Sequence, residues 1–283
     1  MRHLDWLAAT LDLLAAQPVC GYAAGDAPAT EPTALAALAL TAHGRANDAE
    51  PAIAHLINSQ AADGSVGIRA SEATPGWPTA WAVLAWHATN TASRHEERIA
   101  RAVLWQLTAQ GKPLEQSSEF GHNTEIVGWS WAENTHSWVE PTALHVAALK
   151  AAGQSWHPRV REGVRMLIDR QLPGGGLNYG NTYVLGQLLR SHVQPTGATL
   201  VALAGENDAS GRLSRSVAWL RREAGPRTTP TSLAWAILGL KAQHSELPGA
   251  GERLAAAHDW VLARDKSPYK LALLALAAKG WPT

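Results

Sequence analysis

The chain has 283 residues, with 24 Lys and Arg against 24 Asp and Glu, so its formal net charge is zero. A protein that binds nucleic acid by neutralising phosphates needs a basic excess, so we expect no nucleic-acid partner. Hydrophobic residues make up 46% of the chain, which is enough for a large core. The aromatic set is unusual, because 13 Trp stand beside 4 Tyr and a single Phe.

The N-terminal segment and the cysteine content indicate the cellular compartment. Cys20 is the only cysteine, which excludes an intramolecular disulfide and cysteine-rich metal clusters. The first apolar stretch contains Asp5 and Asp12, which favours an amphipathic helix over a signal peptide. No window of 18 uncharged apolar residues occurs, so we expect a soluble cytoplasmic protein.

One element recurs along the chain: a proline, usually followed by threonine, and then a run of Ala and Leu. Its prolines are Pro32, Pro78, Pro141, Pro195, Pro230 and, in a degenerate copy, Pro268. Proline suits the first turn of a helix, and a run that is apolar on all sides predicts a buried helix. Amphipathic segments lie between these runs, at Leu4–Ala16, Glu50–Ser59, Arg94–Leu107, Pro158–Gln171, Arg212–Glu223 and Glu252–Arg264.

This alternation predicts an all-α fold in two layers, in which amphipathic helices cover buried ones. A closed α6/α6 toroid, with two concentric rings of helices, satisfies the pattern. An open solenoid would bury its inner helices equally well, and periodicity alone leaves both architectures open.

A glutamine followed by a glycine-rich turn occurs at the end of several amphipathic segments. This element occurs at Gln60 and Gln171, and a looser version joins Gln106 to Gly128-Trp129. Here the chain resembles the squalene–hopene and related terpene cyclases and the protein prenyltransferase β subunits, which carry repeated Gln-x(2–5)-Gly-x-Trp elements. The terminal Trp of that element is Val66 in one copy and Leu177 in another. The resemblance implies a single α6/α6 toroid domain over residues 1–283.

The resemblance also implies a catalytic acid. Residues 138–143 align with the acidic motif of protonating cyclases, and Glu140 takes the place of the aspartate that protonates an alkene or epoxide. A carboxylic acid kept protonated beside an apolar cavity can protonate such a poor base. His136 and His145 are the candidates for orienting it. Glu31 has the same Glu-Pro-Thr context, and either carboxylate could simply complement the helix start, worth ~0.3–1 kcal/mol.

Indoles are the side chains that best stabilise a cation by cation–π attraction, so we predict that several tryptophans bind substrate. Trp77 and Trp81, four residues apart, are expected on one helix face, with packing against the wall as the alternative. Residues 120–145 are predicted to form an ordered loop over the mouth of the toroid. The full set of predicted substrate-binding residues is Trp77, Trp81, Trp129, Trp131, Trp138, His122, Glu125, Asn178 and Tyr179.

The residues also define the alternatives. Pro18 stands two residues before Cys20, so the aspartate of the prenyltransferase zinc site is missing, and no two aspartates are adjacent as a magnesium motif requires. We expect no metal and no cofactor. The leading hypothesis is a cyclase or isomerase of an apolar isoprenoid. The second is a non-catalytic toroid that binds a lipid, a membrane surface or a protein. The third is an acid/base or metal enzyme that uses His122, Glu125 and His136.

Overall fold

A computed structural model describes residues 2–90, 93–117 and 119–282, with side chains from Trp6 onward. Helices dominate the described residues, which confirms the predicted all-α fold, and a single two-stranded hairpin accompanies them. Among the described residues, no helix is both long and apolar enough to cross a membrane. The elements are α1 (Arg2–Ala16), α2 (Thr30–Ala42), α3 (Ala46–Asn58), α4 (Thr79–Ala88), α5 (Glu96–Thr108), α6 (Val139–Ala151), α7 (Pro158–Asp169), β1 (Tyr183–Val184), β2 (Gln187–Leu188), α8 (Val193–Ala202), α9 (Arg212–Glu223), α10 (Pro230–Ala242), α11 (Ala250–Arg264) and α12 (Pro268–Lys279).

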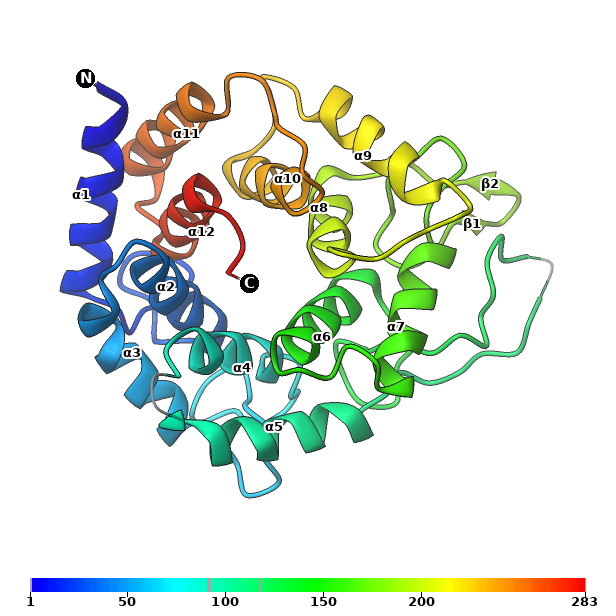
Figure 1. The fold of residues 1–283 in the computed structure, drawn as a ribbon, viewed down its shortest axis with the longest axis horizontal. Coiled ribbons are helices and arrows are strands. Elements are labelled where there is room, and N and C mark those ends of the chain that lie inside the picture. The colour runs from blue at the N-terminus through cyan, green and yellow to red at the C-terminus, as the bar shows by residue number, and fades with distance from the viewer. Residues whose placement is uncertain (1, 91–92, 118, 283) are drawn as a thin grey trace.

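The even-numbered helices form the inner layer, and each packs against the next in chain order. Helix α12 packs back on α2, so the contacts of the inner layer return to their starting point. The odd-numbered helices lie outside them, each against one or two inner helices (Figure 1). The N-terminal helix α1 covers α12 and α2, which joins the two ends of the chain.

Burial explains why the two kinds of segment take these layers. In α6 every residue from Pro141 to Leu149 is buried, as the continuous apolar run predicts. In α7 the buried face holds Val160, Val164 and Leu167, whereas Arg165 is exposed. A helix buried all round needs neighbours on every side, while an amphipathic helix needs neighbours on one side only.

The threonine of the repeated Pro-Thr element holds the preceding connection against the inner helix. The hydroxyl oxygens of Thr33, Thr79 and Thr142 accept hydrogen bonds from the backbone N–H groups of Cys20, Val66 and Trp129, at 3.2, 2.8 and 2.9 Å. Each N–H lies 13 residues before its threonine. Thr196 binds the N–H of Leu177 in the same way, at 2.9 Å. These buried backbone groups would otherwise lack a partner.

At their C-terminal ends the inner helices are tied to one another by lysines. Lys150 of α6 donates from Nζ to the carbonyl oxygens of Ala202 and Ala204, at 3.1 and 2.6 Å. Lys241 of α10 donates in the same way to Ala277 and Ala278 at the end of α12. Cations placed here satisfy the free carbonyls and complement the negative end of each helix.

Helices α8 and α10 approach closely because each has a glycine at the contact. A Cβ at Gly239 would lie 2.6 Å from the carbonyl oxygen of Gly197, and one at Gly197 would lie 2.3 Å from that of Trp235. Any larger side chain would force the two helices apart.

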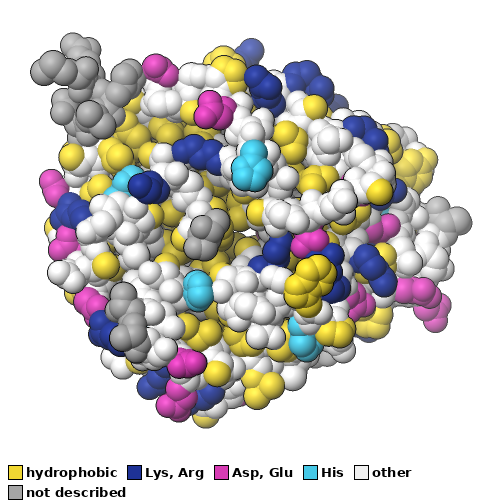
Figure 2. Space-filling model, in the orientation of Figure 1, with side chains coloured by type: hydrophobic (Ala, Val, Ile, Leu, Met, Phe, Trp, Pro, Cys, Tyr) yellow, Lys and Arg dark blue, Asp and Glu magenta, His cyan; other side chains and the backbone are white. Residues whose placement is uncertain are grey.

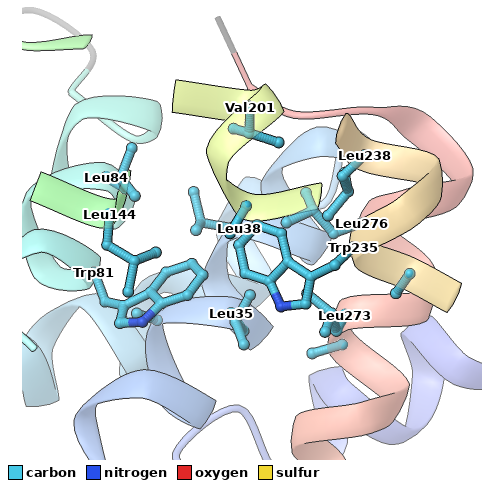
Figure 3. Packing of buried hydrophobic residues seen from close by; sticks show 14 of the residues in the cluster. Leu35, Leu38, Trp81, Leu84, Leu144, Val201, Trp235, Leu238, Leu273 and Leu276 are labelled. Carbon is cyan, nitrogen blue, oxygen red and sulfur yellow. The ribbon is translucent and has the colours of Figure 1, made fainter. Parts of the chain in front are cut away.

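Apolar side chains from all six inner helices converge on the axis of the inner layer (Figure 3). Trp81 of α4 and Trp235 of α10 are both buried there, with ring centroids 6.1 Å apart. Trp281, which follows α12, lies 5.9 Å from Trp81 and 5.7 Å from Trp235. The C-terminal segment thus bends into the middle of the ring (Figure 1), and apolar side chains are visible near the hollow at the centre of this face (Figure 2).

In the connection from α5 to α6, residues 110–117 and 119–126 lie on the outside of the molecule beside α7 (Figure 1), and not over the mouth as predicted, whereas Trp129 and Trp138 lie at the start of α6. Arg159 of α7 fixes the connection by donating to the carbonyl oxygens of Val127 and Gly128, at 3.0 and 2.7 Å. Those backbone groups need a partner, and the guanidinium of α7 supplies it, which holds the connection against the outer layer.

Candidate functional site

Two glutamates with the same Glu-Pro-Thr context meet at one end of the inner layer. Glu31 lies in the first turn of α2, and Glu140 in the first turn of α6. The two carboxyl groups are close enough that the charge of Glu140 raises the pKa of Glu31. We call this end, formed by Glu31, Glu140, Tyr22, Tyr179, Gln194 and Tyr269, the N-terminal mouth.

Glu31 is a carboxyl group whose surroundings favour the protonated form. Burial raises its pKa to about 7, and the charge of Glu140 contributes in the same direction. Tyr22 opposes this shift, because its hydroxyl donates a 2.8 Å hydrogen bond to Oε2 of Glu31. A carboxyl group with a pKa near 7 is partly protonated at neutral pH and can act as a general acid.

Glu140 is held by a side chain from the neighbouring inner helix. Nε2 of Gln194, in the first turn of α8, donates a 2.9 Å hydrogen bond to Oε1 of Glu140. Burial raises the pKa of Glu140, and the bond from Gln194 opposes that rise. The mouth therefore contains two carboxyl groups, each with one neutral donor.

Tyrosines complete the mouth. The rings of Tyr22 and Tyr269 lie 5.4 Å apart. Burial raises the pKa of Tyr269 well above its usual value, and the charges of Glu31 and Glu140 add to the rise. Burial and Glu140 likewise raise the pKa of Tyr179. These phenols stay protonated, so they can donate hydrogen bonds but cannot take up the proton of a neighbouring acid.

Trp81 connects the mouth to the apolar interior. Its indole N–H interacts with Glu31 and lowers the pKa of that carboxyl, yet Nε1 has no hydrogen-bond partner within 3.5 Å among the described residues. The ring itself packs against Trp235 and Trp281 on the axis. A proton donor beside several indole rings is a combination that can generate a carbocation and then stabilise it.

We predicted that His136 or His145 orients Glu140. This prediction is wrong, because the side chain that donates a hydrogen bond to Glu140 is Gln194. Nδ1 of His145 instead forms a 2.8 Å hydrogen bond with Oε1 of Gln106 of α5, and its ring stacks on Trp129. Five residues along a helix correspond to a rotation of about 140°, so His145 points to the outer layer when Glu140 points to the mouth. His136 packs against Trp138 before α6 begins.

The predicted tryptophans fall into separate groups. Trp77 and Trp81 do not share a helix face, because α4 begins only at Thr79 and Trp77 lies in the preceding turn. Trp77 contacts Trp131 on the outer flank, with ring centroids 4.8 Å apart. Together with Trp129 they line a cavity of about 300 Å³. Trp138 is the residue before α6, and only Trp81 reaches the axis.

The remaining predicted residues lie around the long connections. His122 is buried, bonds to the hydroxyl of Thr182 at 3.1 Å, and shares a small cavity with His136. Burial and the charge of Arg170 lower the pKa of His122 to about 4. Glu125 is exposed and does not line that cavity, so the structure does not bring together the proposed acid/base set.

Asn178 stabilises its own turn and does not point to a ligand site. Its Nδ2 donates to the carbonyl oxygen of Arg190 at 2.7 Å, and its Oδ1 accepts from the N–H of Tyr179. In the described part of the chain, no three His, Cys, Asp or Glu residues are grouped closely enough to hold a metal ion.

Sequence reasoning missed Tyr22, Gln194, Tyr269, Trp235 and Trp281 as neighbours of the candidate acid. The sequence offered one signal. The residues that directly precede the first four Pro-Thr elements are, in chain order, Glu31, Trp77, Glu140 and Gln194. Two of these residues meet in the structure, because Gln194 donates a hydrogen bond to Glu140 where α8 and α6 begin. The tyrosines carry no such pattern.

Comparison with solved structures shows a shared fold. The type II terpene cyclase MstE from Scytonema, in complex with geranylgeranyl dihydroxybenzoate, has a TM-score of 0.58 at 15% identity, covering 93% of this chain and 80% of that one. A protein from Actinoplanes also gives 0.58 at 15% identity, covering 92% and 80%. Salmonella alpha-2-macroglobulin reacted with methylamine gives 0.54 at 14% identity, covering 96% of this chain and 17% of that one. No family model and no curated protein matches the sequence.

Proposed function

We propose that the protein is a type II terpene cyclase or isomerase, built on a single α6/α6 toroid, in which the N-terminal mouth protonates an apolar isoprenoid. The observation that supports this most directly is the placement of Glu31, which accepts a 2.8 Å hydrogen bond from Tyr22 and lies next to Trp81, whose ring packs on the axis; burial beside Glu140 raises the pKa of Glu31 to about 7. At neutral pH such a carboxyl group still holds a proton that an ordinary surface carboxylate has already lost, so it is available as a donor at the edge of the aromatic interior. The shared fold with MstE, which binds a geranylgeranyl substrate, is consistent with it.

Glu31 is the proposed donor, and Glu140 is the positioning charge that keeps it protonated. Two carboxyl groups that sense each other do not ionise together readily, so the ionised form of one favours the protonated form of the other. Burial raises the pKa of both carboxyl groups, but the charge of Glu140 raises only that of Glu31, so Glu140 is the member that loses its proton first. This assignment refines the sequence hypothesis, which gave the acid role to Glu140.

The proposed reaction is an isomerisation, so atoms and protons balance without a cofactor. The carboxyl O–H of Glu31 gives its proton to one carbon of a terminal alkene, which leaves a tertiary carbocation and a carboxylate. A second double bond of the substrate attacks the cation, forming a C–C bond and moving the charge along the chain. Loss of a proton from the last cation to water ends the reaction, and proton exchange with solvent restores the carboxyl O–H of Glu31. Trp81 and Trp235 lie where their π faces would stabilise these cations.

The substrate would occupy the axis where Trp281 now packs against Trp81 and Trp235. None of the cavities described above is bordered by Glu31 or Glu140. We therefore propose that an isoprenoid enters the ring by displacing Trp281 and the segment that follows α12. Trp281→Ala is expected to lower the KM for a polyprenyl substrate by about threefold to tenfold, because a bulky competitor for the site is removed.

The direct test is incubation with linear geranylgeranyl-bearing substrates, followed by mass spectrometric and NMR analysis of products. We expect a cyclised isomer of unchanged mass. Glu31→Gln should reduce turnover by ~10²–10⁴-fold, the usual contribution of a general acid. Glu140→Gln should reduce it less and shift the pH optimum downward, since the charge that raises the pKa of Glu31 is lost. Full turnover in Glu31→Gln would refute the assignment.

The second candidate function is a non-catalytic toroid that binds a lipid. It predicts that a polyprenyl ligand binds and is recovered unchanged, with equal affinity in the native protein and in Glu31→Gln. Tight binding without product, in both proteins, would favour this function over catalysis.

A further inference from the structure

A cavity on the outer flank is separate from the N-terminal mouth. It has a volume of about 300 Å³ and lies between the start of α4, the end of α5 and residues 129–134 of the connection that follows. Trp77, Trp105 and Trp131 are prominent in its lining, one from each of these segments. Neither Glu31 nor Glu140 borders it, so the proposed cyclisation gives this cavity no role. We call it the flank cavity.

The walls of the flank cavity are indole rings at different angles. The rings of Trp77 and Trp131 are nearly perpendicular, at 86°, with centroids 4.8 Å apart. Trp105 approaches the turn before α4 closely, since a Cβ at Gly76 would lie 2.5 Å from Cζ2 of its indole. Perpendicular aromatic walls present both faces and edges to one small volume, which is the geometry of an aromatic cage.

Trp129 supports these walls rather than serving as one. The guanidinium of Arg159 lies 3.7 Å from the centroid of the Trp129 ring, and the ring of His145 stacks on Trp129 at 5.2 Å with a 17° angle. These two contacts already occupy the face of the Trp129 ring, so it is less available to a ligand than the other indoles. Its Nε1 donates to the carbonyl oxygen of Gln106 at 2.9 Å, which fixes the ring firmly in place.

The charge in the flank cavity has one sign. Glu133 is the only Asp, Glu, Lys or Arg in its described lining. His145, which also lines it, stays neutral because burial lowers its pKa to about 3. Among the described residues, Glu133 forms no ion pair, whereas many of the other acidic side chains do. The cavity thus combines aromatic walls with one uncompensated carboxylate.

From these features we propose that the flank cavity binds an organic cation of the quaternary or methylated ammonium class. Indole is the best side chain for attracting such a cation, and aromatic cages recognise it in preference to a hydrated ion. A volume of about 300 Å³ is at the lower end for ligand sites and suits a head group of choline size rather than a long chain. Glu133, exposed at the rim, contributes attraction at longer range.

Isothermal titration with choline, compared with its neutral carbon analogue 3,3-dimethylbutan-1-ol, tests the proposal. The two probes have nearly the same shape and differ in charge. We expect choline to bind with a Kd of millimolar or tighter, and the neutral analogue to bind at least tenfold more weakly. Equal binding of both would show a merely apolar pocket and overturn the proposal, and so would failure of choline to bind.

Two variants locate the site. Trp131→Ala should weaken choline binding at least tenfold, and Glu133→Gln should weaken it about threefold. Trp156→Ala and Glu125→Gln are matched controls at exposed positions outside the cavity and should bind choline like the native protein. Circular dichroism of each variant establishes that the fold is retained. Unchanged binding in a folded Trp131→Ala protein would overturn the assignment.

Glu31→Gln separates this inference from the proposed function. Because the flank cavity does not include Glu31, the variant should lose turnover and keep choline binding. Indole N–H signals in NMR spectra provide a second readout, with choline shifting those of Trp77, Trp105 and Trp131. Shifts confined to Trp81, Trp235 and Trp281 would place the cation on the axis instead and refute the flank site.

Discussion

Helices α2 and α6 begin with the same tripeptide, Glu-Pro-Thr, yet their glutamates have different surroundings. Thr33 and Thr142 have the same role in the two helices, because each hydroxyl oxygen accepts a hydrogen bond from the backbone N–H 13 residues earlier. The glutamates differ because Glu31 receives its hydrogen bond from the phenol of Tyr22, while Glu140 receives one from the amide of Gln194. A local sequence thus determines a helix start, and the neighbours determine how its carboxyl group titrates.

The largest expected difference between the two helix starts is in the pH dependence of stability. The pKa of Glu31 is raised from 4.5 to about 7, so between these values the folded state binds more protons than the unfolded state. The free energy of unfolding should therefore fall as pH rises through this window, by up to about 3 kcal/mol from this group. Urea unfolding at pH 4.5, 5.5, 6.5 and 7.5 measures the slope.

Glu31→Gln should remove this decrease in the free energy of unfolding with pH. The difference between the native protein and the variant then gives the contribution of Glu31 alone. The buried His122 and His145, whose pKa values are lowered to about 4 and about 3, have the opposite effect, because they reduce stability as pH falls below 6.5. They are present in both proteins and cancel in the difference. A larger change of slope in Glu140→Gln than in Glu31→Gln would reverse the comparison.

The two threonine contacts should be similar in strength. Thr33→Val and Thr142→Val each leave a buried backbone N–H without a partner, which should lower the free energy of unfolding by about 1–3 kcal/mol. Thr41→Val is the control in α2, because the Thr41 hydroxyl is buried with no partner in the described structure, so its loss should be neutral or stabilising. Chemical denaturation of the three variants measures these changes. It shows whether the threonine of the Pro-Thr element contributes equally to stability in both copies.

The smallest expected effect is on the pKa values of the glutamates themselves. The hydrogen bond from Tyr22 lowers the pKa of Glu31, so Tyr22→Phe should raise it further, by about one unit or less. Gln194→Leu should raise the pKa of Glu140 for the same reason. Carboxyl 13C NMR titration reports both values. If either variant lowers the pKa of its glutamate, the role given to that donor is incorrect.

Most of the helical architecture could be predicted from the sequence, because the way in which a helix is buried determines where its apolar residues stand in the sequence. The run after Pro141 is apolar all round, and the structure buries it on all sides; the segment after Pro158 alternates, and it lies outside. The candidate site was harder to predict. Glu31 and Glu140 have the same local context, and only the resemblance to protonating cyclases favours Glu140.

The histidines show why side-chain partners could not be predicted. His145 and Glu140 are only five residues apart in the sequence. On a helix, however, this spacing points their side chains in different directions. Gln194 is 54 residues from Glu140 in the sequence, and only the packing of α8 against α6 brings the two side chains together.

The tryptophan excess, the zero net charge and the alternation of two kinds of helix were determined by the sequence itself, since composition and periodicity are local properties. Only the tertiary structure decided which tryptophans lie on the axis and which line the flank cavity, because neighbouring residues can turn to opposite sides of one helix start. It also decided that two glutamates share one mouth, and pKa shifts of this kind arise from burial and proximity, which no short segment encodes.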